Sequence, residues 1–158
     1  MAITVAVSMV HSRLDYANSL VPGHTNVKRL QSVQNSAARV VLKDSHHLSS
    51  GDLLRKLHWL PVQSRIEFKI ACITYKVLTS FTTGQRTYLS TSLNHYTPLR
   101  TLLSANQYLL QYPRVSTEFA KRSFSCLAPK IWNNMPHDIR LCCTLPTFKR
   151  HLKTYIFK

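Results

Sequence analysis

The sequence predicts a mainly α-helical fold, with a small two-stranded element and an amphipathic helix near the C-terminal end. Apolar residues recur at helical spacing in two long segments, 27–43 and 62–79. Val21-Pro22-Gly23 and Leu60-Pro61 interrupt the chain where helices would end or begin. A chain of 158 residues, of which 44% are hydrophobic, is long enough to bury one core. We therefore expect one compact unit.

The first half of the chain is expected to begin with a helix over about Ile3–Leu20, followed by a second helix capped by Thr25 or Asn26. At about 100° per residue, the apolar positions of this second helix fall on one arc: Leu30, Val33, Ala37, Val40 and Val41. Its basic positions fall on the opposite arc: Lys28, Arg29, Arg39 and Lys43. This spacing predicts a helix that packs by one face and presents a cationic face.

A short helix over 52–57 and a longer helix over 62–79 are expected next. The longer helix carries an apolar stripe made of Ile66, Ile70, Ile73 and Val77. Such a stripe predicts the central core helix. Asp52 lies near a helix start and Glu67 has basic neighbours, so both are expected to act as helix-dipole or surface partners.

The segment Ser80–Asn106 is rich in Ser and Thr, which predicts a connector with one helical turn near Tyr88–Leu93. The segments Gln107–Gln111 and Phe119–Phe124 are short, aromatic-rich and bounded by turn residues. This pattern predicts a small antiparallel pair of strands around Pro113.

The C-terminal part is expected to hold a short helix over Ala128–Asn134 and a last helix capped by Thr144, with Pro146 in its first turn. The apolar side of the last helix consists of Leu145, Phe148, Leu152, Tyr155 and Ile156. Its basic flank consists of Lys149, Arg150 and Lys153. The last helix is therefore predicted to be amphipathic and basic.

Charge is the strongest feature of the composition, because 21 Lys and Arg stand against six Asp and Glu, giving a net charge of +15. Such an imbalance indicates a polyanionic partner, either nucleic acid or an anionic membrane surface. The alternative is a solvated basic surface without a special partner. No stretch approaches the roughly 18 apolar residues that would span a bilayer, and no signal peptide is expected. Four irregularly spaced cysteines favour reduced thiols inside the cell.

Motifs for catalysis are missing from the sequence. Two-metal chemistry needs clustered carboxylates, whereas the six acidic residues are isolated from one another. A Gly-x-Ser-x-Gly turn and a glycine-rich phosphate loop are both missing. Four possible metal ligands lie close in sequence: His137, Cys142, Cys143 and His151. The adjacent cysteines lack zinc-ligand spacing, so surface histidines and core thiols are favoured. We predict no catalytic residue, metal site or cofactor.

Cationic residues alternate with aromatic ones in the second half of the chain. The pairs are Arg86 with Tyr88, Tyr96 with Arg100, Tyr112 with Arg114, and Lys121-Arg122 with Phe119 and Phe124. Exposed aromatics stack on unpaired bases while cations neutralise phosphates, so this mixture suits single strands or duplex ends. For any single aromatic, burial in the core is the favoured alternative. Trp59 and Trp132 are expected to be core residues.

Several phrases occur in a characteristic order. They are Ser12-Arg13-Leu14-Asp15-Tyr16-Ala17-Asn18-Ser19-Leu20, the run 30–39 (LQSVQNSAAR), the run 57–62 (LHWLPV), Arg65-Ile66, Phe68-Lys69, Tyr96-Thr97-Pro98, Pro113-Arg114, the run 128–133 (APKIWN) within 124–136, and Phe148-Lys149. This ordered set resembles the C-terminal region of non-LTR (LINE-type) retrotransposon reverse transcriptases of the chicken-repeat and jockey-like clades. The resemblance covers nearly the whole chain, although the family usually has Cys where this chain has Ala17.

In that family the catalytic aspartates, including an aromatic-x-Asp-Asp step, lie before the region matched here, and Asp15 does not correspond to a metal ligand. The resemblance implies a thumb-like helical segment over 1–80, a Ser/Thr-rich connector over 81–107 and a C-terminal extension over 108–158. It implies a fragment of an RNA-directed DNA polymerase that is not itself an enzyme and that acts in the nucleus. The alternative is a structural module, or a non-functional relic, that packs against a missing palm and fingers.

The expected partner is the backbone of template or primer RNA or DNA, with no membrane partner. The residues expected to contact it are Lys28, Arg29, Arg39, Lys43, Arg114, Lys121, Arg122, Lys149, Arg150 and Lys153.

Overall fold

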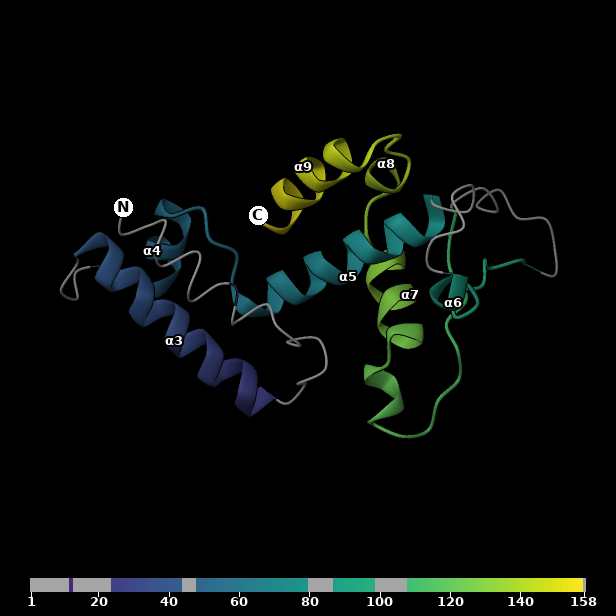
Figure 1. Ribbon diagram of the computed structural model, residues 1–158, viewed down its shortest axis with the longest axis horizontal. Coiled ribbons are helices and arrows are strands. Elements are labelled where there is room, and N and C mark those ends of the chain that lie inside the picture. Colours follow the sequence, from purple (N-terminus) through teal and green to yellow (C-terminus); the bar gives the residue numbers. More distant parts are fainter. Residues whose placement is uncertain (1–11, 13–23, 44–47, 80–86, 99–107, 158) are drawn as a thin grey trace. The chain divides into compact units, whose positions relative to one another are not determined.

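A computed structural model of the chain describes residues 12, 24–43, 48–79, 87–98 and 108–157. The described residues are mainly helical, as predicted, and form no strand (Figure 1). The chain divides into two compact units, 1–66 and 67–158. The predicted helix over Ile3–Leu20 and the cations Arg86 and Arg100 lie outside the described residues, Ser12 excepted.

The first unit is built on helices α3 (His24–Leu42) and α4 (Ser50–Lys56), which pack against each other. Its buried cluster consists of Ala38, Leu53, Leu54 and Trp59, with Ala37, Val41, Leu42, Leu48 and Leu57 partly buried around it. The second predicted helix and the core position of Trp59 are thus confirmed. The predicted cap is wrong, because the helix begins at His24 and both Thr25 and Asn26 lie inside it.

The packed face of α3 differs from the prediction. Val33 and Val40, assigned to the packed arc, are 53% and 77% exposed, whereas Gln34 is fully buried. The Nε2 of Gln34 donates to the carbonyl oxygen of Leu60 at 2.8 Å, and the Oε1 of Gln31 accepts from the backbone N–H of Val62 at 2.9 Å. Because a hydrogen-bonded amide can be buried at low cost, the helix turns Gln34 rather than Val33 towards the core.

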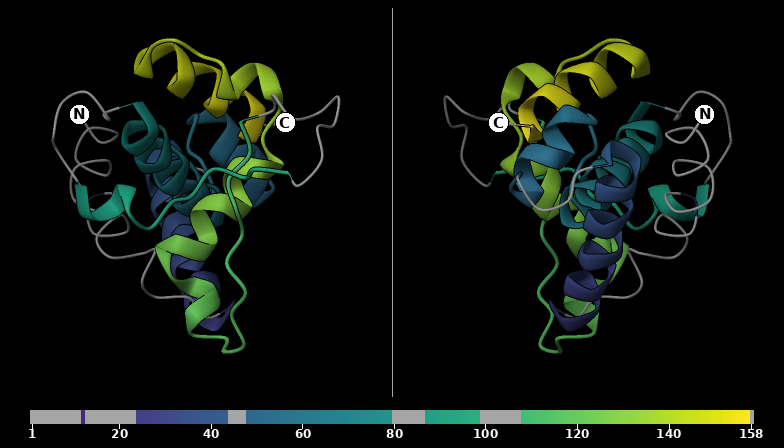
Figure 2. Two further views of the ribbon diagram at one scale, coloured as in Figure 1. Left: turned by 90° about the vertical axis from the view of Figure 1, so that its right-hand side faces the viewer. Right: turned by 90° about the vertical axis from the view of Figure 1, so that its left-hand side faces the viewer.

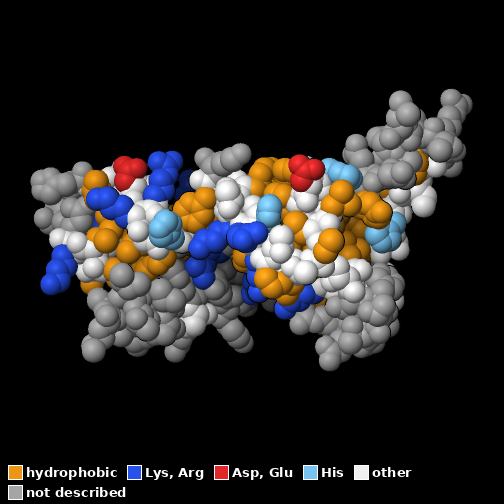
Figure 3. Space-filling view, turned by 90° about the horizontal axis from the view of Figure 1, so that it is seen from above, with side chains coloured by type: hydrophobic (Ala, Val, Ile, Leu, Met, Phe, Trp, Pro, Cys, Tyr) orange, Lys and Arg blue, Asp and Glu red, His pale blue; other side chains and the backbone are white. Residues whose placement is uncertain are grey.

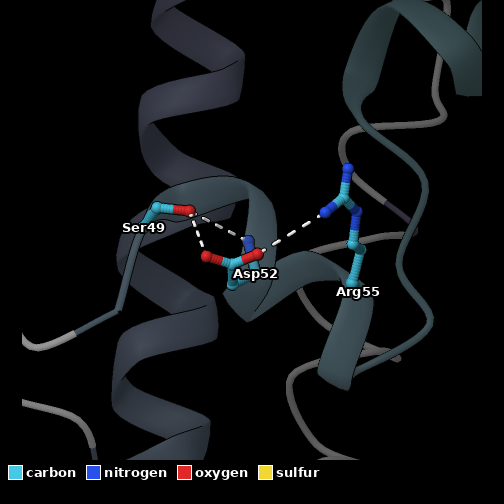
Figure 4. Close-up of polar contacts among 3 residues, drawn as sticks. All are labelled: Ser49, Asp52 and Arg55. Atoms are coloured by element: carbon cyan, nitrogen blue, oxygen red, sulfur yellow. Dashed lines mark hydrogen bonds and ion pairs between the residues drawn. The ribbon is translucent and has the colours of Figure 1, made fainter.

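Helix α4 shows how its start is fixed (Figure 4). The N-cap residue Ser49 accepts through Oγ from the backbone N–H of Asp52 at 3.3 Å and donates to the Asp52 carboxylate at 2.7 Å. The same carboxylate lies 3.6 Å from Arg55. An acid in the first turn also opposes the positive end of the helix dipole. The role predicted for Asp52 is confirmed.

The second unit has an aromatic centre. The ring of Phe148, on α9 (Leu145–Ile156), stacks on Tyr75 at 4.4 Å and lies 6.1 Å from Trp132 on α7 (Phe124–Asn134). Tyr75 belongs to α5 (Val62–Thr79), and its hydroxyl donates to the carbonyl oxygen of Cys142 at 2.7 Å. Phe148 is fully buried and Trp132 is 3% exposed.

The predicted apolar stripe lies along α5: Ile66, Ile70 and Val77 are buried, and Ile73 is half-buried. Thr144 caps α9 by accepting from the N–H of Thr147 at 3.4 Å, with Pro146 in the first turn, as predicted. Helix α7 starts one turn earlier than predicted and continues through Pro129.

The predicted pair of strands is wrong. Leu110 instead forms an isolated antiparallel bridge with His95, supported by Tyr96 N–H to Leu109 O (2.9 Å) and Gln111 N–H to Asn94 O (2.8 Å). The connector segment therefore supplies the partner, next to the short helix α6 (Thr87–Ser90).

The other predicted strand, Phe119–Phe124, is helical: it forms the 3₁₀ turn η3 (Ala120–Arg122) and then enters α7. The hydroxyl of Thr117 accepts from Ala120 N–H at 3.2 Å. This local side-chain bond favours a turn over a strand. Between α7 and α9 lies the short helix α8 (His137–Arg140).

Candidate nucleic-acid interface

The basic side of α3 is the first part of the candidate interface. Lys28, Arg29 and Lys43 are exposed and Arg39 is half-buried. Lys28 and Arg39 are eleven residues apart, so they lie on nearly the same side about 16 Å apart along the axis. The sequence of α3 contains neither Asp nor Glu. The structure thus brings the four predicted cations to one side of a helix that has no acidic side chain of its own.

Arg39 differs from the other three cations of this side in its burial. Its Nε is buried and makes no hydrogen bond. A buried donor without an acceptor costs free energy, and an atom shielded from solvent is not open to a phosphate oxygen. Lys43, just after the helix, adopts a left-handed backbone (φ 51°), and its N–H donates to Val40 O at 3.4 Å.

Helix α9 carries the second basic surface. Lys149, Arg150 and Lys153 are exposed, whereas Phe148 and Leu152 are buried on the other side. This helix also contains no Asp or Glu. The Nζ of Lys153 lies 5.9 Å from the ring centroid of Phe157, a cation–π contact that restrains the lysine. The predicted amphipathic basic helix is confirmed.

The third set of predicted cations lies before α7, where Arg114, Lys121 and Arg122 are all exposed. Lys121 forms an ion pair with Glu118. Their hydrogen bond, followed by their opposite charges, holds the pKa of Glu118 below its ordinary value and raises the pKa of Lys121. Because Glu118 offsets its charge, Lys121 is expected to attract a phosphate less strongly than Arg114 or Arg122.

The exposed aromatics contradict the prediction that any single one is buried. Tyr88, Tyr96, Tyr112 and Phe119 are 73%, 51%, 47% and 85% exposed, and Phe124 is half-buried. Tyr108, which the sequence patterns did not single out, is 58% exposed. The side chains that could stack on bases are therefore available to solvent.

Arg140, at the end of α8, is a cation that the sequence patterns missed. Its Nε and Nη1 are buried and make no hydrogen bond, and burial lowers its pKa. No sequence signal marks it, because nothing in its local pattern separates it from the other basic residues.

The thiols and histidines form no metal site in the described part of the chain. Burial raises the pKa of the Cys72 thiol and that of the Cys142 thiol. The neighbouring Cys143 raises the pKa of Cys142 further. A raised pKa keeps a thiol protonated, which disfavours both nucleophilic attack and metal binding.

On the face drawn in Figure 3, Lys and Arg side chains are frequent, Asp and Glu are sparse, and hydrophobic side chains lie among them. Within the described residues, no helix is long and apolar enough to cross a membrane. Comparisons with protein-family models, with curated proteins and with solved structures found no match.

Proposed function

We propose that this chain is a non-catalytic part of a retrotransposon RNA-directed DNA polymerase that holds template and primer nucleic acid through basic helices. The observation that carries the proposal is the side of α3 on which Lys28, Arg29, Arg39 and Lys43 gather without an acid in the helix. Each cation that neutralises a phosphate releases condensed counterions, and this release drives binding to any sequence. The basic side of α9 acts in the same way.

Binding of a labelled RNA and of a primed duplex, measured by fluorescence anisotropy against salt concentration, tests this proposal. The logarithm of the binding constant should fall by about 0.7 to 0.9 per contacted phosphate for each tenfold rise in salt. Micromolar protein that leaves both probes unbound at low salt would contradict the proposal.

The contribution of α3 is tested by the triple variant Lys28→Gln, Arg29→Gln, Lys43→Gln. We expect the salt slope to fall by about 2 to 3 and the affinity at low salt to fall on the order of a hundredfold. The matched control is Lys56→Gln, which removes an exposed lysine of another helix, α4. If the control and the triple variant change the slope equally per charge removed, net charge alone drives binding.

A second candidate is a structural module that packs against another part of the polymerase. The observation that favours it is the exposure of Val33 and Val40, at 53% and 77%, beside the basic residues of α3. Sedimentation should then show self-association that Val33→Ser, Val40→Ser abolishes, without any affinity for nucleic acid. In both proposals the chain does not itself copy a template, so primer extension with a divalent metal should yield no incorporation.

A further inference from the structure

The segment before α7 has an outward side that alternates with an inward one. Residues 112, 114 and 116 are exposed, whereas Pro113 and Val115 between them are half-buried. Alternate side chains of an extended chain point to the same side. Tyr112 and Arg114 therefore share the outward side, with an aromatic ring next to a guanidinium.

This segment is held in place by the C-terminal end of α7. The Nε1 of Trp132 donates to the carbonyl oxygen of Tyr108 at 2.9 Å. The amide of Asn133 accepts from Leu110 N–H at 2.9 Å and donates to Leu110 O at 2.8 Å. Asn133 thus pairs with Leu110 as a neighbouring strand would. In Figures 1 and 2 the green segment runs beside α7 and turns back into it.

Tyr108, at the start of the segment, adopts a left-handed backbone (φ 50°). A residue with a Cβ pays free energy for that conformation, which persists only where surrounding contacts impose it. Here the contact with Trp132 fixes the Tyr108 carbonyl, while the Tyr108 ring stays 58% exposed. The residue with the strained backbone, Tyr108, is thus also one whose aromatic ring faces solvent.

The turn after the segment adds another ring and more cations. Phe119 is 85% exposed, and the backbone N–H groups of Lys121 and Arg122 donate to Thr117 O and Phe119 O, both at 3.1 Å. A single exposed hydrophobic residue needs no explanation. The repeated pairing of exposed rings with exposed cations, on a segment fixed by side-chain hydrogen bonds, does point to a ligand with both apolar faces and negative charge.

We infer that residues 108–122, named here the aromatic limb, bind single-stranded nucleic acid, with unpaired bases stacked on Tyr112 and Phe119 and phosphates held by Arg114 and Arg122. This inference rests on the proposed function, and it states that the nucleic acid bound at this surface is single-stranded. A continuous duplex hides its base faces, so only its phosphates would be recognised here.

The test compares two probes with the full chain: an oligo(dT) of about 15 nucleotides, and a DNA hairpin duplex closed by loops at both ends. The double variant Tyr112→Leu, Phe119→Leu should bind oligo(dT) roughly tenfold or more weakly and leave duplex binding unchanged. The matched control is Tyr155→Leu, because Tyr155 is 41% exposed and lies on the apolar side of α9, outside the aromatic limb. This control should change neither affinity.

A second readout detects stacking directly. Trp59 and Trp132 are 5% and 3% exposed, so bases cannot stack on them. The variant Phe119→Trp should retain oligo(dT) affinity, and its fluorescence should be quenched by oligo(dT) but not by the closed duplex. The variant Tyr155→Trp should show no quenching.

The outcomes separate the two proposals. Wild-type protein that binds neither probe overturns the proposed function and this inference with it. Wild-type protein that binds both probes, with the double variant unchanged or equally weakened on both, overturns only the aromatic limb. Equal quenching of the Phe119→Trp and Tyr155→Trp variants overturns it as well.

Discussion

The basic side of α3 and the aromatic limb are fixed in different ways. Helix α3 is regular over His24–Leu42, so its own backbone hydrogen bonds set the spacing of its cations. The aromatic limb begins with a segment outside any helix. This segment is held by Asn133 and Trp132 of α7 and by the backbone hydrogen bonds of Leu109 and Gln111 with residues 94–96. A change in Asn133 can therefore remove some of the contacts that hold the limb, whereas the cation spacing of α3 survives most single changes.

The two regions also differ in chemistry. Around its cations α3 presents the exposed side chains of Ser32, Ser36, Val33 and Val40, none of which is aromatic. The aromatic limb places Tyr112 and Phe119 among its cations, at 47% and 85% exposure. The α3 side can respond only to the charge of a strand, whereas the limb can also respond to its bases. Variants of the two regions should therefore separate charge-driven binding from base stacking.

The largest effect is expected from Gln34→Ala, which removes the anchor of α3. Gln34 is fully buried and donates to Leu60 O at 2.8 Å, so its loss leaves a buried carbonyl unsatisfied. The free energy of unfolding should fall by about 1–3 kcal/mol, measured by urea titration. The control Ser32→Ala, on the exposed side of α3, should change it by less than about 0.5 kcal/mol. An equal change in both variants would contradict the anchoring role of Gln34.

Gln34 also shows where sequence patterns stopped being informative for α3. The helix, its basic residues and the core position of Trp59 follow from periodicity and composition. The packed face does not, because a count of apolar residues gives Val33 and Val40 to the core. The bond that buries Gln34 joins it to Leu60, 26 residues away, and no local pattern encodes it.

A smaller and more local effect is expected from Asn133→Asp. The change keeps the acceptor that binds Leu110 N–H but removes the Nδ2 donor and sets a carboxylate against Leu110 O. Loss of one such bond corresponds to about 1 kcal/mol, so oligo(dT) affinity should fall about threefold to tenfold while duplex affinity stays unchanged. Hydrogen exchange of the Leu110 amide should become faster.

The neighbouring variant Asn134→Asp is the charge-matched control. The Asn134 side chain is exposed, and its replacement by Asp adds the same negative charge one residue away. Comparable losses in the two variants would show that charge, not the clamp on Leu110, causes the effect.

The aromatic limb was only partly predictable. The alternation of rings and cations is visible in the sequence, and so is a β-like tendency before Gln111. The predicted pairing partner of this segment was wrong. The segment pairs with residues 94–96, and sequence periodicity cannot show whether this pairing or a local hairpin is more stable. By contrast, α9 was predicted closely, since its Thr144 cap, Pro146 and apolar spacing are all local signals.

The smallest effect is expected from Glu118→Gln, which sharpens the contrast between a free and a paired cation. Because the pKa of Glu118 is lowered, its carboxylate is charged throughout the neutral range, and the pair with Lys121 is lost only as the pH falls below the ordinary value of 4.5. The Gln variant frees Lys121 at neutral pH. Affinity for oligo(dT) should rise less than about threefold, with a salt slope steeper by less than about one.

The control for this variant is Asp138→Gln, which removes the same charge from an exposed position on α8. If the two variants tighten oligo(dT) equally, the gain comes from net charge and Glu118 does not restrain Lys121 in particular. A gain confined to Glu118→Gln would place Lys121 on the bound strand, next to the phosphates that Arg114 and Arg122 hold. The aromatic limb would then be a surface whose charge is moderated by its own acid, in contrast to α3, which has none.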